Sequence, residues 1–166
     1  ILRWSDAELG EVPEIQALQT AETAGVIREL TWWIFNNALR QSAEFARAGL
    51  ECKLGLKVTA SGLLQPDFPE FVDRALRTWG VPPGRVVIGI HETAIAGDLG
   101  PVKNTLARLK RLGIRLGING FATGASSLSN LAQLPFDELK LSADFVADMQ
   151  RSELHLKLVR ALVRLA

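Results

Sequence analysis

The chain has 166 residues, of which 48% are apolar and 22% are charged, and its net charge is +1 at pH 7. This length and composition predict one globular domain and exclude a disordered or collagen-like chain. No apolar run reaches the roughly 18 residues of a membrane span, and the dispersed basic residues argue against a nucleic-acid polymer as partner. With a single cysteine and no visible signal peptide, we expect a cytoplasmic α/β domain without disulfides, in which Cys52 is buried.

Helical and extended patterns alternate along the chain. The clearest helical period lies in residues 28–48, where apolar side chains recur at three- and four-residue spacing before Gly49 ends the helix. Asp67 is the expected N-cap of a later helix, which Gly80 ends. In chain order we expect a strand tail at 1–4, helices at 13–24 and 28–48, a strand at 50–60, a helix at 68–79, a strand at 85–90, a helix at 100–112, a strand at 114–118, a loop at 119–127, a strand at 139–141, and helices at 143–149 and 153–165.

This alternation with short connectors predicts βαβ units and a parallel sheet. An open doubly wound sheet and a closed (β/α)8 barrel both fit the periodicity. In either architecture the functional residues follow the carboxyl ends of the strands. Those ends hold residues 3–4, 57–61, 89–93, 119–127 and 140–143.

The side chains at these strand ends are poor in metal ligands. Lys57 and Lys140 are cationic, whereas a divalent metal prefers several hard oxygen donors, usually with carboxylates among them. Glu92 directly follows His91, but adjacent residues of a strand point to opposite faces, which argues against an acid–base pair. Residues 121–128 form a string of small, hydroxyl and glycine residues, which suggests a backbone-lined anion site or a loop switch.

That string also carries a family resemblance. Residues 119–128, N-G-F-A-T-G-A-S-S-L, resemble the D-D-F-G-T-G-Y-S-S-L motif of EAL domains, the bacterial cyclic di-GMP phosphodiesterases. Further landmarks agree in order and spacing: residues 1–4 with L-L-R-W, 21–25 with A-E-x-x-G, 56–60 with V-N-x-S-A, 88–93 with L-E-I-T-E-S, and 134–142 with L-P-x-D-x-L-K-I-D. The resemblance implies a modified (β/α)8 barrel, and residues 1–166 are expected to form a single EAL-like domain that is shorter than the family's at both ends.

The resemblance also implies which residues would carry the chemistry. Active members use two divalent ions, magnesium or manganese, to activate the water that attacks a phosphodiester bond. The positions that match the family's metal ligands here hold Lys57 for the motif asparagine, Gly89 for a glutamate, and Asn119, Gly120 and Ser142 for aspartates. The family lysine that orients the water is kept as Lys140.

These departures change the charge of the matched positions by about five units toward positive. Two unit charges 4 Å apart interact by roughly 4 kcal/mol at an effective dielectric of about 20, so Lys57 would repel a divalent cation strongly. The resemblance therefore predicts a degenerate EAL domain that has lost its metal ions and, with them, its phosphodiesterase activity.

Three residues at positions that match the family allow roles other than metal-dependent hydrolysis. Glu92 matches the glutamate that anchors the family's mobile loop, which favours a folded module. Arg3 matches an arginine that contacts the nucleotide in the family, or else forms a salt bridge at the barrel rim. Lys57 either adds positive charge for a phosphate, together with Lys140, or fills the empty metal site and pairs with Glu92.

Three functions follow from this interpretation. The first is a catalytically inactive module that signals through a protein partner or as a homodimer. The second is a metal-independent receptor for cyclic di-GMP that uses Arg3, Lys57 and Lys140. The third, which the lost ligands disfavour, is a residual phosphodiesterase.

Overall fold

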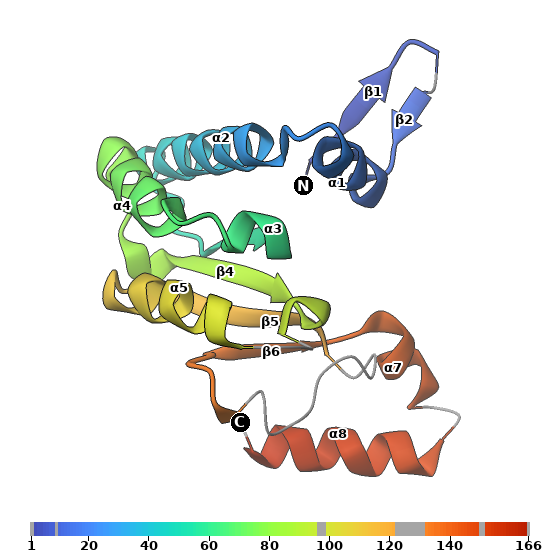
Figure 1. Cartoon of the computed structure of the whole chain (residues 1–166). Helices are drawn as coiled ribbons and strands as arrows, with labels where there is room; N and C mark the ends of the chain where they lie inside the picture. Colours follow the sequence, from blue (N-terminus) through green and yellow to red (C-terminus); the bar gives the residue numbers. More distant parts are fainter. Residues whose placement is uncertain (1, 9, 96–98, 122–131, 150–151, 166) are drawn as a thin grey trace.

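The computed structural model describes residues 2–8, 10–95, 99–121, 132–149 and 152–165 (Figure 1). Its elements are β1 (Trp4–Asp6), β2 (Gly10–Val12), α1 (Glu14–Thr23), α2 (Ile27–Arg47), β3 (Leu54–Val58), α3 (Ala60–Leu63), α4 (Phe68–Trp79), η1 (Pro83–Arg85), β4 (Val86–His91), η2 (Glu92–Ile95), α5 (Gly100–Arg111), β5 (Arg115–Phe121), β6 (Glu138–Leu141), α7 (Ala143–Asp148) and α8 (Glu153–Leu165). The expected helices and the strands of the main sheet are confirmed to within a few residues.

The main sheet has four parallel strands in the order β3-β4-β5-β6. This order follows the chain without the reversal that marks a doubly wound sheet, so it favours a (β/α)8-type arrangement. The expected strand tail at residues 1–4 is wrong: Trp4 starts a separate antiparallel hairpin in which it pairs with Val12. Strands of three residues are too short to show a period in the sequence.

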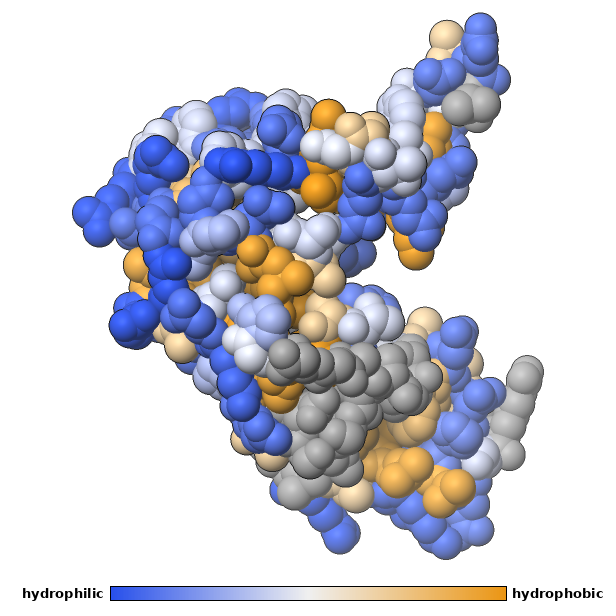
Figure 2. Space-filling view, viewed as in Figure 1, coloured by the Kyte–Doolittle hydropathy of each residue, from blue (hydrophilic) through white to orange (hydrophobic). Residues whose placement is uncertain are grey.

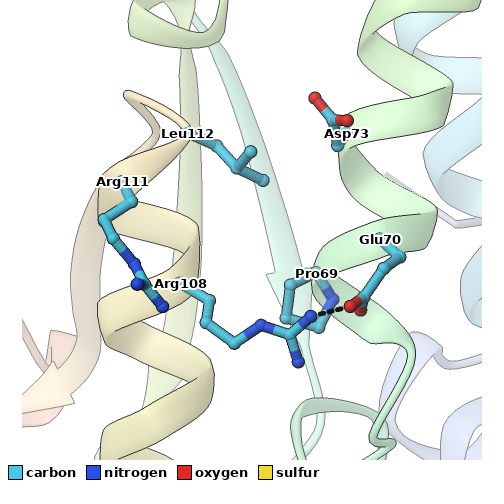
Figure 3. Close-up of a pocket in the computed structure, with 6 residues that line it drawn as sticks. All are labelled: Pro69, Glu70, Asp73, Arg108, Arg111 and Leu112. Atoms are coloured by element: carbon cyan, nitrogen blue, oxygen red, sulfur yellow. Dashed lines mark ion pairs between the residues drawn. The ribbon is translucent and has the colours of Figure 1, made fainter.

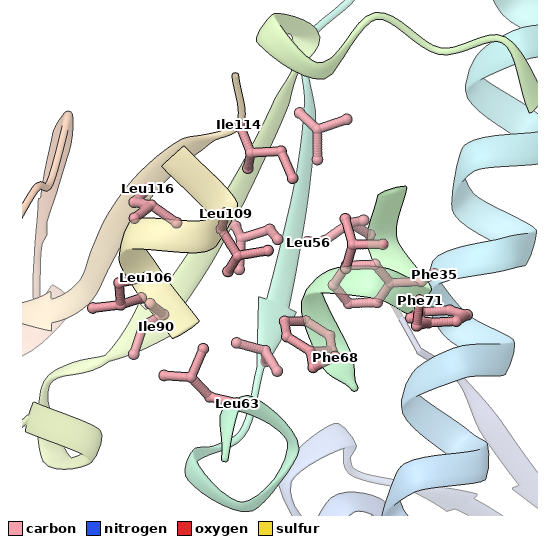
Figure 4. Close-up of a cluster of buried hydrophobic side chains, with 14 of the residues drawn as sticks. Phe35, Leu56, Leu63, Phe68, Phe71, Ile90, Leu106, Leu109, Ile114 and Leu116 are labelled. Carbon is pink, nitrogen blue, oxygen red and sulfur yellow. The ribbon is translucent and has the colours of Figure 1, made fainter. Parts of the chain in front are cut away.

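One face of the sheet is covered by α2, α4 and α5, and the hydrophobic core fills the space between (Figures 1 and 4). Phe35 of α2 is fully buried and meets Phe68 of α4 edge-to-face, with ring centroids 5.5 Å apart. Trp32 stacks on Phe71 at 4.7 Å. Alternate strand residues complete this core, namely Leu56, Val58, Ile88, Ile90, Leu116 and Ile118. The apolar positions expected from the helix period and from strand alternation thus form one buried layer between the helices and the sheet.

Several local expectations need correction. Asp67 stands at the N-cap position of α4 but makes no capping bond, because its carboxylate pairs with Arg28. Cys52 is exposed, so the expected burial is wrong. The loop expected from residue 119 is also wrong at its start, because β5 continues to Phe121. The rest of the string, residues 122–128, lies outside the described residues.

Candidate functional site

The candidate site lies on the sheet face opposite the helices, at the carboxyl ends of the strands. Because side chains alternate along a strand, the residues between the buried core positions point to this side. The strand register places Lys57 beside Gly89, and His91 beside Asn119. We call this surface the inner face and define it by Lys57, Gly89, His91, Asn119 and Lys140. Most of the matched positions therefore gather on one edge of the sheet.

Lys57 does not fill the centre of this face. Its side chain is 67% exposed, and its Nζ atom lies 3.1 Å from Oε2 of Glu14, at the start of α1. Glu92, the partner suggested by the sequence, is buried with 1% exposure at the start of η2. The proposed pairing of Lys57 with Glu92 is therefore wrong, and Lys57 instead links β3 to α1.

The side chain of Asn119 covers Gly89 on the neighbouring strand. A Cβ atom added to Gly89 would lie 2.3 Å from Nδ2 of Asn119 and 3.1 Å from its Cγ. The amide of β5 therefore already occupies the space into which a side chain at position 89 of β4 would start.

The side chain of His91 covers Gly120 in the reverse direction, from β4 onto β5. Gly120 has a φ of +68°, and a Cβ atom added there would lie 2.9 Å from Nε2 of His91. The ring is held by Thr93, whose backbone N–H donates to Nδ1 at 3.4 Å and whose Oγ1 lies 3.0 Å from the same atom. The sequence predicts that His91 and Glu92 point to opposite faces of the sheet. The structure agrees, since His91 is exposed and Glu92 is buried.

The remaining matched residues are distributed around this edge. Ser142 caps α7, because its Oγ accepts a hydrogen bond from the N–H of Phe145 at 3.2 Å. Lys140 is exposed near the end of β6. Arg3 is exposed just before β1, and no carboxylate in the described ranges forms an ion pair with it. The suggested rim salt bridge of Arg3 is therefore not seen there.

These donors do not fit a two-metal centre. The matched positions offer an ammonium, an amide, a hydroxyl and two glycines, whereas a pair of divalent cations needs several hard oxygen ligands. Across the part of the chain that the structure describes, no three His, Cys, Asp or Glu side chains gather closely enough to hold a metal.

A separate cavity of about 230 Å³ lies between α4 and α5 (Figure 3). Its lining consists of Pro69, Glu70, Asp73, Arg108, Arg111 and Leu112, with an ion pair between Arg108 and Glu70. None of these residues is a candidate site residue.

Among the described helices, none has the length and apolar character needed to cross a membrane.

Several known proteins are similar to this chain in sequence. The chain is 31% identical over 99% of its length to an uncharacterized signaling protein of Caulobacter vibrioides, of which it covers 20%. It is 28% identical over its whole length to the cyclic di-GMP phosphodiesterase RocR of Pseudomonas aeruginosa, of which it covers 42%. The chain thus spans less than half the length of these curated relatives.

The fold is also found in solved structures. A structure described as "PaMucR Phosphodiesterase, c-di-GMP complex" matches 99% of this chain and 67% of its own, with a TM-score of 0.90 and 26% identity. This likeness confirms the expected α/β fold of the modified (β/α)8 type. The EAL domain model matches residues 1–166. The chain therefore belongs to the EAL domain family.

Proposed function

We propose that this chain is a catalytically inactive EAL module of bacterial cyclic di-GMP signalling, which acts in the cytoplasm through contact with a protein partner or a second copy of itself. The observation that carries the proposal is the set of donors on the inner face and at Gly120 and Ser142, which lacks carboxylates at the matched metal positions. The nucleotide class comes from the relatives, several of which are named as cyclic di-GMP phosphodiesterases.

The missing ligands argue against hydrolysis on energetic grounds. Metal ions contribute to such reactions by activating water and by stabilising the charge that develops on the phosphate. At the matched positions, two divalent ions would meet only cations and neutral donors, with no carboxylate to offset their charge. Loss of bound metal removes the main source of rate acceleration while leaving the core intact.

A hydrolysis assay tests the proposal directly. The full-length protein is incubated with cyclic di-GMP in magnesium and then in manganese, and linear dinucleotide is measured by chromatography, with RocR as the active reference. We expect no linear product above the buffer blank, while circular dichroism shows a folded protein. Metal-dependent product formation would overturn the proposal and support the residual phosphodiesterase.

A second candidate function is a metal-independent receptor for cyclic di-GMP. It is favoured by Arg3, which is free of ion pairs to described carboxylates, and by the exposed cations Lys57 and Lys140, since cations suit phosphate recognition. Calorimetric titration of cyclic di-GMP in EDTA, and then in magnesium, separates the candidates. Micromolar binding in EDTA that is lost in Arg3→Ala, but kept in the exposed control Arg74→Ala, would establish the receptor.

The contact function itself has a structural basis in exposed apolar side chains. Trp33 of α2 is 59% exposed and Ile15 of α1 is 69% exposed, and Figure 2 shows further apolar surface over α8. An exposed apolar stretch such as the one over α8 is typical of surfaces that meet other proteins, whereas single exposed apolar side chains are common on any protein. Sedimentation velocity distinguishes a homodimer, which dissociates with dilution, from a monomer that requires a different protein.

A further inference from the structure

The cavity between α4 and α5 lies on the helix-covered side of the sheet, away from the candidate site. We infer that this cavity is the docking site for an acidic segment of the protein partner, which places an apolar side chain in the cavity and its carboxylates against Arg111 and Arg74. The inference rests on the proposed contact function and adds the place and the chemistry of that contact. Docking there leaves the inner face free.

The cavity has an apolar floor between two charged walls. Pro69 is buried and Leu112 is partly buried, and Figure 3 shows Leu112 pointing between the two helices. The volume of about 230 Å³ is below the roughly 300–1,000 Å³ of typical small-molecule sites, so it suits one side chain of a partner better than a free cofactor. An apolar centre inside a polar rim is also the usual anatomy of a protein–protein interface.

The two carboxylates of the walls are already paired within the chain. Glu70 forms an ion pair with Arg108, whose guanidinium also donates a hydrogen bond to the carbonyl of Pro66 at 3.3 Å. Asp73 pairs with Arg77 at 3.1 Å. Neither carboxylate is therefore available to bind a cationic partner without breaking a pair that is already formed.

Two further arginines beside the cavity have no such partner. Arg111 lines the cavity at the end of α5, and Arg74 lies on α4 four residues after Glu70, which places it on the same side of that helix. Both are exposed, and no carboxylate in the described ranges forms an ion pair with either. With the paired residues included, four arginines stand against two carboxylates, a net charge of +2.

This excess of arginine selects the charge of the partner. A guanidinium binds a carboxylate through two parallel N–H donors, which adds geometric specificity to the charge attraction. A basic segment would meet repulsion from Arg74 and Arg111 and would find the carboxylates occupied. The charges therefore favour an acidic partner, and the apolar floor favours one that carries an apolar residue among its acidic ones.

Fluorescence polarisation with a defined peptide tests the inference. The probe is a fluorescein-labelled Glu-Glu-Leu-Glu-Glu peptide, titrated with the full-length protein at low ionic strength, where screening is weak. We expect saturable binding that Arg111→Ala weakens about fivefold and that Asp73→Ala, which frees Arg77, strengthens about twofold. The control Arg160→Ala removes an exposed cation of α8, which lies apart from α4 and α5 in Figure 1, and is expected to leave binding unchanged. Circular dichroism confirms that each variant is folded.

Matched peptides separate the parts of the contact. Replacing the central leucine by glycine is expected to weaken binding because the cavity stays unfilled, and a Lys-Lys-Leu-Lys-Lys peptide is expected not to bind. No saturable binding, or equal weakening by Arg111→Ala and Arg160→Ala, would overturn the inference. Displacement of the probe by free glutamate at the same concentration would also overturn it and indicate a small-molecule site.

A second copy of the chain is the alternative occupant. If Arg111→Ala abolished self-association in sedimentation velocity but left peptide binding unchanged, the cavity would be an interface between copies and the inference would be overturned. Failure of the peptide to bind leaves the proposed loss of hydrolysis untouched, because the two are measured separately. Metal-dependent hydrolysis would overturn the proposed function, and the polarisation assay would still decide whether the cavity binds an acidic segment.

Discussion

The two ends of β6 lie a few residues apart and differ in how tightly their polar residues are held. At the amino end, Asp137 accepts hydrogen bonds from Nζ of Lys110 at 2.6 and 2.8 Å and from the N–H of Leu116 at 2.7 Å. Its own N–H donates to the carbonyl of Leu116 at 2.8 Å. At the carboxyl end, the side chain of Ser142 accepts a hydrogen bond from the N–H of Phe145, and its own N–H donates to the carbonyl of Phe121 at 3.0 Å.

The difference separates residues that hold the fold from residues that would carry chemistry. Partial burial by itself raises the pKa of Asp137, but the hydrogen bonds from Lys110 and Leu116 and the charges of Lys110 and Arg115 outweigh it, so the pKa lies below its ordinary value. In barrels of this type the amino edge serves stability, whereas the carboxyl edge serves function. This chain keeps its carboxylate where the fold needs it and has none at the matched positions of the other edge.

The largest effect is expected at the amino edge. Asp137→Ala removes a charged pair and leaves the N–H of Leu116 without its acceptor, so we expect a loss of about 2 kcal/mol in the free energy of unfolding. Urea denaturation at pH 7 measures it. The control Asp73→Ala breaks an exposed pair with Arg77 and is expected to cost about 0.3 kcal/mol. A loss as small as the control's would show that Asp137 contributes no more to stability than an exposed ion pair, so the two edges would not differ in this respect.

The same carboxylate predicts a pH dependence. Because the pKa of Asp137 is lowered on folding, its stabilisation is complete above the unfolded pKa of about 3.9 and is lost as pH falls through the folded value. Asp137→Asn, which keeps an acceptor but no charge, is therefore expected to be less stable than the parent at pH 7 and to approach it at an acidic pH below the lowered pKa of Asp137. Urea denaturation at both pH values measures the gap, and a constant gap would show that charge is not the cause.

At the carboxyl edge the expected effect is smaller. Ser142→Ala removes the N-cap of α7 and is expected to cost about 1 kcal/mol. Ser142→Asp restores a carboxylate that also caps well, so its free energy of unfolding should lie within about 0.5 kcal/mol of the parent. Thermal unfolding of both variants measures this. If Ser142→Asp were as damaging as Ser142→Ala, the serine would be needed for more than its capping oxygen.

The helices and strands are predictable from the sequence where a hydrophobic period or a terminating residue is present. The helix at 28–48 and the end at Gly80 follow from periodicity and from the left-handed conformation that glycine accepts. The string of small residues from residue 119 onward favours a loop, whereas β5 continues to Phe121. Local propensity failed there because the strand is held by its pairing with β4, a contact between distant segments.

The candidate site was predictable as a set of positions but not as a set of contacts. Ordered motifs brought Gly89, Asn119 and Lys140 to one edge, as the register shows. The bond from Lys57 to Glu14 joins residues 43 positions apart and depends on where α1 lies. The place of His91 over Gly120 depends on strand register, and a glycine facing a ring on the next strand is the signal that could have revealed it.

The smallest effect is expected at Lys57. Its pair with Glu14 joins a side chain that is mostly exposed to one that is partly exposed, and such pairs contribute about 0.3 kcal/mol. Lys57→Asn, which restores the asparagine of the family motif, should therefore change the free energy of unfolding by no more than about 0.5 kcal/mol, with Glu14→Gln as the matched control. Urea denaturation in low and high salt measures it. A loss above about 1 kcal/mol would mean that the carboxyl edge, too, serves the stability of the fold. The contributions of Lys57 and Asp137 to the free energy of unfolding would then be similar in size.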